Sequence, residues 1–537
     1  MRWGAVWWVG ALLLAACGSD SSGVTQGTSN EIASTTSSVA STTSPPDPAD
    51  PPPPPSPVVT DPAEGAGTTP PSDPVQTTPS SQPSTPSTDA PPTAGVVDPD
   101  GIGDVLFPEL GNPGIDVQDY DVRLSYDPDA DTIVGSVTMQ ISMTEDRDQF
   151  TLDSVGPAID AVTIDGGAAT FAAEDRELRI TPADALTVGQ QITVVVDYHA
   201  APDAGASTSA GLPVGWFNTL GGSYVLNEPD GARTWLPSND HPADKATWTF
   251  EITVPTGDTA VANGAHVSTT PGPNGDTGVW REDQPMATYL IQLETGDYQL
   301  VEGTGPDALP LLSVVLREDV AKMQVYVDAI NEEIDFFDGF FGPYPLDRYG
   351  IAMTDSASGL AMETQGRSLF SRDDFSGTLG YVEQLLLSHE LVHQWFGDAV
   401  TLARWQDIWL NEGFATYGEW MWLDHVGMQP LNDAADSALA QKQSVGGASS
   451  ADPTVDGLFG FNSYDGGAVT LHALRLTIGD DAFFELLQRW VAENNGTSRT
   501  TAEFIEEASK VAGTDLTAFF DAWLFSTDVP SAYPTAT

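Results

Sequence analysis

Cysteine and positive charge are both scarce in this sequence. Its 537 residues include one cysteine, Cys17, so no disulfide can form within the chain, and neither a zinc–thiolate site nor a cysteine nucleophile can lie in its folded body. Lysine and arginine total 19 against 77 aspartates and glutamates, which gives a formal net charge of −58. Because phosphate backbones repel such a chain, nucleic acid is excluded as a partner. The acidity fits either simple solubility or a saline habitat, where salt screens self-repulsion.

The apolar stretch near the N-terminus is too short to span a bilayer. It covers about twelve residues, Trp3 to Leu14, after the positive Arg2, and this is the length of a signal-peptide core. It ends in the run Leu-Ala-Ala before Cys17, which resembles the lipobox of bacterial lipoproteins. The resemblance implies that Cys17 is lipidated and anchors the protein at the extracellular face of a bacterial membrane. The alternative is an ordinary signal peptide with an incidental cysteine.

Composition and periodicity divide the chain into five parts. From residue 18 to about residue 100, small and polar residues and proline dominate without a hydrophobic period, so this stretch cannot bury enough apolar surface to fold. Alternating apolar residues follow to about residue 300, and helical spacing follows after about 305. We therefore expect a signal peptide at 1–17, a disordered Ser/Thr/Pro-rich tether at 18–104, an N-terminal β domain at 105–303, a mainly helical domain at 304–527 and a tail at 528–537.

Individual elements can be placed within this frame. Thr500 and Glu503 form a capping-box pattern at the start of one helix. Strands are predicted at 120–126, 134–143, 191–198, 309–316, 349–354 and 367–370. Helices are predicted at 320–341, 379–396, 408–425, 469–478, 482–493 and 502–511.

The strongest motif is His-Glu-Leu-Val-His at 389–393. On a helix, His389 and His393 project from one face one turn apart, and two imidazoles at that spacing can hold one Zn2+. Glu390 lies beside them and can act as a general base on a water molecule. Two surface histidines on an acidic helix are the plainer interpretation, but this helix is strongly apolar, and buried histidines need partners. The motif therefore predicts two metal ligands and a catalytic base.

The third ligand is expected from the next helix. Glu412 follows His393 by 19 positions, so a helix end, a short connection and a second helix bring it back over the first. Two histidines and one glutamate with a fourth position open are typical of catalytic zinc sites. Glu419 lies two turns further along the same face, and we expect it to accept a hydrogen bond from a ligand imidazole.

These residues carry a resemblance to a known family. The motif at 389–393, eighteen intervening residues and Asn-Glu-Gly-Phe-Ala at 411–415 resemble the aminopeptidase N family of zinc metallopeptidases, the gluzincins. Weaker likenesses are Pro-Met-Ala-Thr-Tyr at 285–289 and Phe-Phe-Gly-Pro-Tyr-Pro at 340–345. The resemblance implies an α+β multidomain fold, with an N-terminal antiparallel β-sheet domain followed by a thermolysin-like, mainly helical catalytic domain. The chain resembles a short form without the large C-terminal helical domain that many relatives carry.

The resemblance also implies how a free N-terminus is held. The run Gly-Leu-Ala-Met-Glu-Thr-Gln around Glu363 is similar to the family's Gly-x-Met-Glu-Asn motif. Glu363 would bind the substrate ammonium, and Ala361 and Met362 would contact the substrate beside it. Leu360 stands where the family has Gly and Thr364 where it has Asn, so the detail of the subsites differs.

Two further residues follow from the same resemblance. Glu228, in Leu-Asn-Glu-Pro, matches a second carboxylate of the family, although Leu226 replaces the usual Gln. Tyr464, in Tyr-Asp-Gly-Gly-Ala, matches the phenol that stabilises the oxyanion, with Gly466 in place of the family's Lys. Taken alone, a glutamate in so acidic a chain is more often solvated surface, and the tyrosine is an ordinary loop residue.

The expected function is that of a zinc-dependent aminopeptidase with one Zn2+ per chain, which releases N-terminal residues from peptides. Its expected partners are peptide substrates with a free N-terminus and, through the anchor at Cys17, the membrane. One alternative is a thermolysin-like zinc endopeptidase, which the two unpaired carboxylates disfavour. The other is a non-catalytic surface lipoprotein that retains the fold.

Overall fold

The structure is a computed structural model, and it describes residues 101–174, 176–201, 207–356, 358–445 and 448–535. The predicted signal peptide, Cys17 and the predicted tether up to residue 100 lie outside the described residues. No helix among those that are described is long and apolar enough to cross a membrane.

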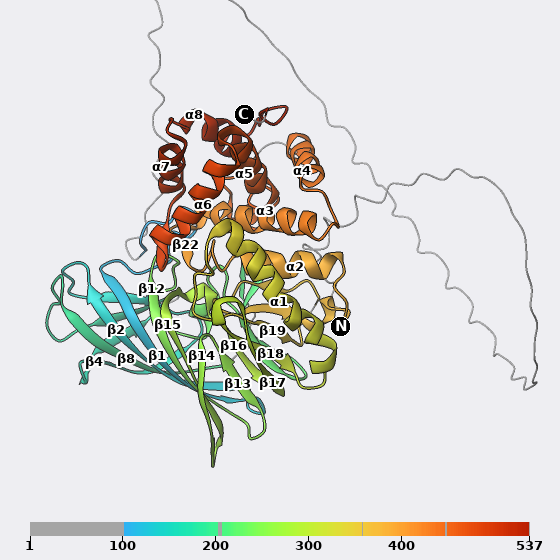
Figure 1. The fold of residues 1–537 in the computed structure, drawn as a ribbon. Helices are drawn as coiled ribbons and strands as arrows, with labels where there is room; N and C mark the ends of the chain where they lie inside the picture. Colours follow the sequence, from blue (N-terminus) through green and yellow to red (C-terminus); the bar gives the residue numbers. More distant parts are fainter. Residues whose placement is uncertain (1–100, 175, 202–206, 357, 446–447, 536–537) are drawn as a thin grey trace, which may run out of the picture. The chain divides into compact units, whose positions relative to one another are not determined.

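A large sheet dominates the first half of the described chain (Figure 1). Its strands alternate as the sequence predicts: in β12, Trp248, Phe250 and Ile252 are buried and the residues between them are partly exposed. All its pairs are antiparallel except β1 with β12, which run parallel. Its strands, in spatial order, are β14 (Ala265–Gly272), β15 (Gly275–Ala287), β12 (Lys245–Val254), β1 (Ile115–Asp127), β2 (Thr132–Met143), β8 (Gln191–Ala200), β4 (Ala158–Ile164) and β5 (Gly167–Ala168).

Two smaller sheets complete the β region. The first comprises β3 (Phe150–Asp153), β7 (Glu177–Thr181) and β6 (Thr170–Ala173). The second comprises β13 (Thr259–Ala262), β16 (Leu293–Gly296), β11 (Gly222–Leu226), β10 (Leu212–Asn218) and β9 (Ser207–Ser209). The end of β11 leads directly into Glu228, so the second sheet fixes the start of the loop that carries this carboxylate.

A mixed sheet opens the second half. Strands β18, β19 and β21 run parallel, and the short β20 pairs antiparallel with β21 at one edge. Ala361 and Met362 form β20 and therefore lie on an edge strand, directly before Glu363. The strands, in spatial order, are β17 (Tyr298–Thr304), β18 (Pro310–Leu316), β19 (Ile351–Thr354), β21 (Ser368–Ser371) and β20 (Ala361–Met362), and β22 (Val400–Leu402) pairs with β23 (Thr497–Arg499) elsewhere. The predicted domain limits stay predictions, and β17 crosses the one at 303.

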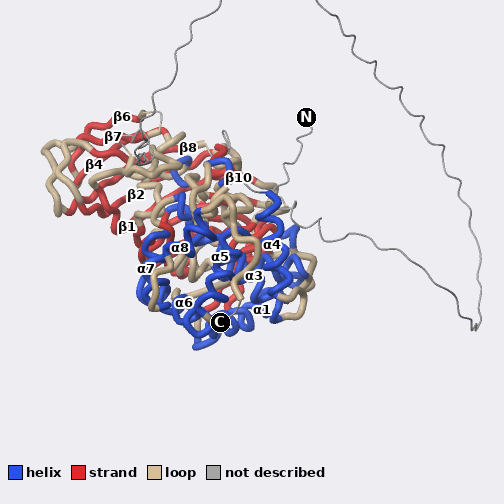
Figure 2. The backbone as a smooth tube through the Cα atoms, turned by 90° about the horizontal axis from the view of Figure 1, so that it is seen from above, coloured by secondary structure: helices blue, strands red, loops and turns tan. Residues whose placement is uncertain are grey.

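The described α-helices all belong to the second half of the chain, and Figure 2 shows them in blue, gathered together. The six predicted helices are confirmed in place, with ends shifted by a few residues, and the predicted capping box at Thr500 and Glu503 is present. Two described helices, α4 and the short α8, were not predicted. The described helices are α1 (Val320–Phe341), α2 (Tyr381–Val392), α3 (Trp409–His425), α4 (Leu431–Val445), α5 (Asp465–Ile478), α6 (Asp480–Asn494), α7 (Thr501–Ala512) and the short α8 (Thr517–Phe520).

Close approaches of backbone hold the central helices together. A Cβ atom at Gly418 of α3 would overlap the side chain of Val392 in α2. A Cβ at Gly413 of α3 would lie 2.8 Å from the Cα of Gly467 in α5, and one at Gly467 would lie 2.7 Å from the Cα of Gly413. These glycines let α3 lie directly against both neighbours, and this brings side chains from three helices to one point.

Candidate active site

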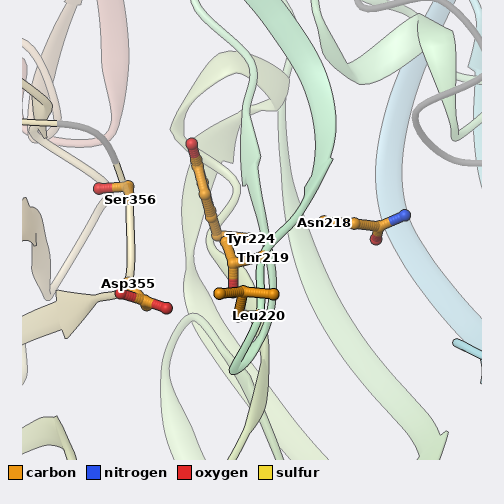
Figure 3. A pocket seen from close by; sticks show the side chains of 6 residues that line it. All are labelled: Asn218, Thr219, Leu220, Tyr224, Asp355 and Ser356. Carbon is orange, nitrogen blue, oxygen red and sulfur yellow. The ribbon is translucent and has the colours of Figure 1, made fainter.

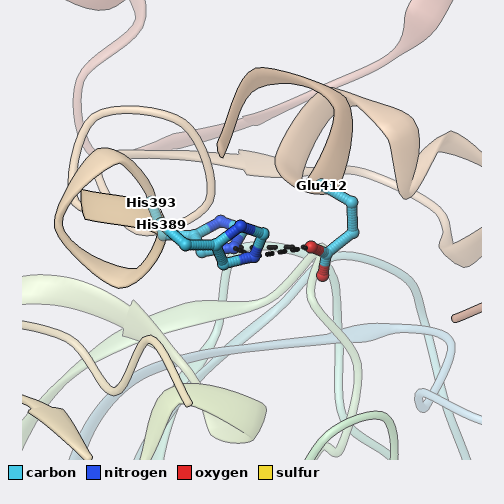
Figure 4. Close-up of side chains that lie close together, drawn as sticks. All are labelled: His389, His393 and Glu412. Atoms are coloured by element: carbon cyan, nitrogen blue, oxygen red, sulfur yellow. Dashed lines mark hydrogen bonds and ion pairs between the residues drawn. The ribbon is translucent and has the colours of Figure 1, made fainter. Parts of the chain in front are cut away.

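The three predicted ligands meet where α2 and α3 pack together (Figure 4). The Nε2 atoms of His389 and His393 lie 3.1 Å apart. The Oε2 atom of Glu412 lies 3.2 Å from Nε2 of His389 and 3.5 Å from Nε2 of His393. The three donor atoms therefore form a nearly equilateral triangle.

This triangle fits a zinc ion. Donors bound to one tetrahedral zinc at 2.0–2.1 Å lie about 3.3–3.4 Å from one another, close to the three distances observed. Glu412 is buried, and although burial alone would raise its pKa, the two histidines lower the pKa to about 2. The carboxylate is thus held in the ionised form that a ligand needs.

The outer nitrogens of both rings are also held. Nδ1 of His389 lies 2.5 Å from Oε1 of Glu419, and Nδ1 of His393 lies 3.1 Å from the carbonyl oxygen of Phe396. A proton on each Nδ1 leaves each Nε2 free to bind metal, and the acceptors orient the rings. Glu419 therefore lies where the sequence predicted a partner for a ligand imidazole.

Glu390 lies on the same helix, next to the ligands. Its side chain is buried, and its Oε2 atom has no hydrogen-bond partner among the described residues. Burial raises the pKa of Glu390 to about 8, although His389 and His393 act in the opposite direction. A carboxyl with a pKa near neutrality can both take up and release a proton at physiological pH.

Glu228 and Glu363 lie beside the metal ligands, although they come from different sheets. Oxygen atoms of Glu228, Glu363 and Glu412 all lie within 4.8 Å of one another. Carboxylate oxygens of Glu363 and Glu390 and a ring nitrogen of His393 also lie within 4.8 Å of one another. Oε1 of Glu228 and Oε1 of Glu363 are both buried without a hydrogen-bond partner in the described part of the chain. Burial and the charge of Glu363 raise the pKa of Glu228 well above its usual range. Two carboxylates this close cannot both ionise easily unless a cation joins them.

Tyr464 reaches the site from the residue before α5. Its ring stacks on the ring of His389, with centroids 5.9 Å apart and planes inclined by 11°. Burial, followed by the nearby carboxylates Glu412 and Glu228, raises the pKa of the Tyr464 phenol well above its usual range. The phenol therefore keeps its proton and can donate a hydrogen bond.

Two supporting residues were not assigned a role from the sequence. The hydroxyl of Tyr289 donates to the carbonyl oxygen of Gly397 at 3.2 Å and accepts a hydrogen bond from Nδ2 of Asn411 at 3.1 Å. These bonds join the end of the β region to the residues that follow α2 and begin α3. Tyr289 belongs to the weak run at 285–289, so the sequence held a signal for it without indicating a role.

A separate hollow lies on the surface near the turn after β10 (Figure 3). Tyr224 faces Asp355 and Ser356 across it, and Asn218, Thr219 and Leu220 complete its lining. It contains none of the predicted ligands or substrate-binding residues, so the chemistry lies in the buried cluster described above.

Comparison with known proteins agrees with this geometry. The model of the Peptidase M1 N-terminal domain matches residues 117–290, and that of the Peptidase family M1 domain matches residues 325–523. The solved M1 zinc metallopeptidase from Deinococcus radiodurans is 30% identical with a TM-score of 0.74, and the match covers 81% of this chain and 100% of that one. The chain belongs to peptidase family M1. The predicted family and the predicted α+β fold are thereby confirmed for this M1 chain.

Curated relatives of this M1 chain are longer than it is. "Probable aminopeptidase 1" of Sulfurisphaera tokodaii is 23% identical over 415 residues, which are 73% of this chain and 51% of the relative. "Aminopeptidase N" of Haemonchus contortus is 29% identical over 317 residues, which are 54% of this chain and 32% of the relative. The chain thus spans about half the length, or less, of these curated relatives.

Proposed function

We propose that this M1 chain is a zinc-dependent aminopeptidase that releases N-terminal residues from peptides. Family membership and the fit of the donor triangle to zinc support the metallopeptidase part. The exopeptidase part rests on one observation, the pair of buried, unpartnered oxygens of Glu228 and Glu363 beside the ligands. A mutant of the Deinococcus radiodurans enzyme has been solved with a Tyr-Ser-Ala substrate, and this supports a peptide as the substrate class.

The carboxylate pair fits a substrate ammonium. A buried carboxylate without a partner is unfavourable, so two of them at one place call for a cation. The ammonium at the start of a peptide has three N–H donors and a full positive charge, and it satisfies both carboxylates at once. An internal segment of a chain has no such charge, so the same pair disfavours cleavage away from the N-terminus.

The edge strand β20 offers a way to align the rest of the substrate. One side of β20 pairs with β21, and no strand of the described residues pairs with its other side. An extended peptide can add to such an edge through backbone hydrogen bonds. In this arrangement Ala361 and Met362 hold the backbone of the substrate, and Glu363 holds its amino end.

The catalytic roles follow from the positions of the polar atoms. His389, His393 and Glu412 would hold a zinc ion, which would act as a Lewis acid that polarises a carbonyl and makes water easier to deprotonate. Glu390 takes a proton from the attacking water at its carboxylate and delivers it to the leaving amine nitrogen. The Tyr464 hydroxyl donates a hydrogen bond to the carbonyl oxygen as that oxygen gains negative charge. Glu419 keeps the His389 ring oriented throughout.

A paired-substrate assay tests the proposal. Leucyl and alanyl arylamides are compared with their N-acetylated forms, with and without a zinc chelator, and we expect chelator-sensitive cleavage of the free amines alone. Glu363→Gln and Glu228→Gln should each lower kcat/KM by about 10–100-fold, because hydrogen bonds to charged groups contribute about 1.5–3 kcal/mol. Glu332→Gln, at an exposed position of α1, is the matched control and should leave kcat/KM unchanged. Glu390→Gln should retain zinc and lose activity.

The two alternatives predict other results. A thermolysin-like endopeptidase cleaves the blocked substrates as well, and a non-catalytic surface lipoprotein cleaves neither while it still binds zinc. The two curated relatives described above are both named as aminopeptidases, which favours neither alternative.

We also propose the lipid anchor at Cys17, with the enzyme at the extracellular face of a bacterial membrane. The support is the lipobox-like run before the sole cysteine of the chain. In a bacterial host, the full chain should partition with membranes and into detergent, and Cys17→Ala should release it. A Cys17→Ala chain that stays with the membrane contradicts the anchor.

A further inference from the structure

One buried lysine lies near the start of α5 and has no role in the chemistry above. Lys442 of α4 is 4% exposed. Its Nζ atom donates to Oγ of Ser450 at 2.5 Å and to Oδ1 of Asn462 at 3.4 Å. No carboxylate forms an ion pair with it within the described ranges, and burial lowers its pKa to about 8.

An ammonium in this position is unfavourable for stability. Burying a charge without a counter-ion is strongly unfavourable, and an apolar side chain of similar length fills such a space without that penalty. The rest of the buried face of α4 is in fact apolar: Ala434, Ala435, Ala438 and Leu439. The reason for a lysine must therefore lie in the groups that its ammonium holds.

The residues that the Lys442 ammonium contacts include two that flank Tyr464 in the sequence. Asn462 lies two residues before Tyr464, and Gly466 lies two residues after it. A Cβ atom at Gly466 would lie 2.7 Å from Nζ of Lys442 and 2.5 Å from Oγ of Ser450, so the ammonium occupies the space of the missing side chain. Glycine is less favourable than alanine in a helix, and at Gly466 of α5 its missing side chain makes room for the ammonium.

We propose that Lys442 is a positioning residue for Tyr464. The Lys442 ammonium holds the turn from Asn462 to Gly466 and thereby fixes the Tyr464 phenol over the zinc ligands. The proposal rests on the role of Tyr464 given above. Within the turn, the backbone hydrogen bonds are local: Ser463 and Tyr464 N–H donate to the Gly460 carbonyl oxygen at 2.9 and 3.4 Å, and Gly466 N–H donates to that of Phe461 at 2.9 Å. The contacts of Lys442 reach the turn from another helix, so they fix it relative to the body of the enzyme.

Kinetics of four variants test this role. Tyr464→Phe removes the phenol and should lower kcat by about 10²–10³-fold. Lys442→Met keeps an unbranched side chain, one atom shorter, and removes the ammonium. Misplacement of the phenol should lower kcat about tenfold, with KM and zinc content unchanged. Lys510→Met, at an exposed lysine of α7, makes the same exchange away from the site and should leave kcat unchanged. The double variant with Lys442→Met and Tyr464→Phe should be no slower than Tyr464→Phe alone, because both act through one hydroxyl.

The outcomes separate the two proposals. If the losses of Lys442→Met and Tyr464→Phe multiply in the double variant, Lys442 acts on general stability and the inference is wrong. If Lys442→Met is as active as Lys510→Met while Tyr464→Phe is impaired, the inference is wrong and the aminopeptidase mechanism stands. A fully active Tyr464→Phe overturns the role of the phenol and the inference with it. Should Lys442→Met not fold, Asn462→Ala removes one acceptor of the ammonium and must show the same lack of additivity.

Discussion

The contact between α3 and α5 allows a prediction whose magnitude follows from the coordinates. Gly413 directly follows the ligand Glu412, and its backbone touches that of Gly467. In Gly467→Ala, the new methyl would lie 2.7 Å from the Cα of Gly413. Ordinary carbon–carbon contacts are about 3.5–4.0 Å, so the helices must separate by roughly 0.8 Å or more. The atom in the way is backbone, and no side-chain rotation relieves the contact.

The expected losses concern stability and activity together. Overpacking of this kind costs about 1–3 kcal/mol, against about 1 kcal/mol gained by replacing glycine with alanine in a helix. The net change in the free energy of unfolding should be a loss of up to about 2 kcal/mol. A shift of nearly 1 Å next to Glu412 should also lower kcat/KM by about 10–100-fold, because it opens the donor triangle.

Gly339→Ala is the matched control. Gly339 lies inside α1 and is exposed. Apart from the neighbouring backbone of α1, no atom would lie within 4 Å of a Cβ atom at this position. The same exchange there should stabilise the protein by about 0.5–1 kcal/mol and leave activity unchanged. Urea unfolding, zinc content and kcat/KM on a leucyl arylamide are measured for both variants. If Gly467→Ala gains stability as Gly339→Ala does and keeps full activity, the contact between α3 and α5 does not determine the position of Glu412.

Two further predictions concern a ligand's partner and a buried acid. Glu419→Gln should weaken zinc binding by about 10–100-fold, because it replaces the charged acceptor of the His389 ring; competition with a chelating indicator measures this, and an unchanged affinity would be evidence against the role of Glu419. Glu333 of α1 is 1% exposed, and burial raises its pKa from 4.5 to about 8. The folded state keeps this proton up to about pH 8 while the unfolded chain loses it near pH 4.5, so the free energy of unfolding falls as pH rises across that window. Glu333→Gln cannot ionise and should reduce this fall, as urea unfolding at pH 5 and pH 8 will show; equal slopes for both proteins are the contrary result.

The sequence predicted those parts of the site that depend on local geometry. The spacing of His389 and His393 places both rings on one helical face wherever the helix lies in the fold, and Glu412 and Glu419 share a face of α3 for the same reason. The long α1 was predicted to the residue, because its apolar side chains are large and regularly spaced.

Other features depend on contacts that no local pattern encodes. The buried face of α4 consists largely of alanines and one lysine, and small residues give a weak apolar period, so this helix was missed. The parallel pairing of β1 with β12 joins strands more than 100 residues apart. Glu228 and Glu363 were recognisable only through the family resemblance, because their meeting depends on two loops from different sheets. The role of Gly466 becomes visible only when the ammonium of Lys442 is seen in its place.

The position of Glu228 has a consequence for how such an enzyme can change. The residues that break the bond all lie in the helical half of the chain, whereas one of the two residues that sense the end of a peptide follows β11 in the β half. Hydrolysis and the choice of where to cut are thus partly encoded in separate stretches of the gene. A change confined to the loop after β11 can turn end-trimming into less selective cutting while the zinc ligands stay intact. An exchange of the β half between relatives should therefore change which peptides are cleaved before it changes the zinc site.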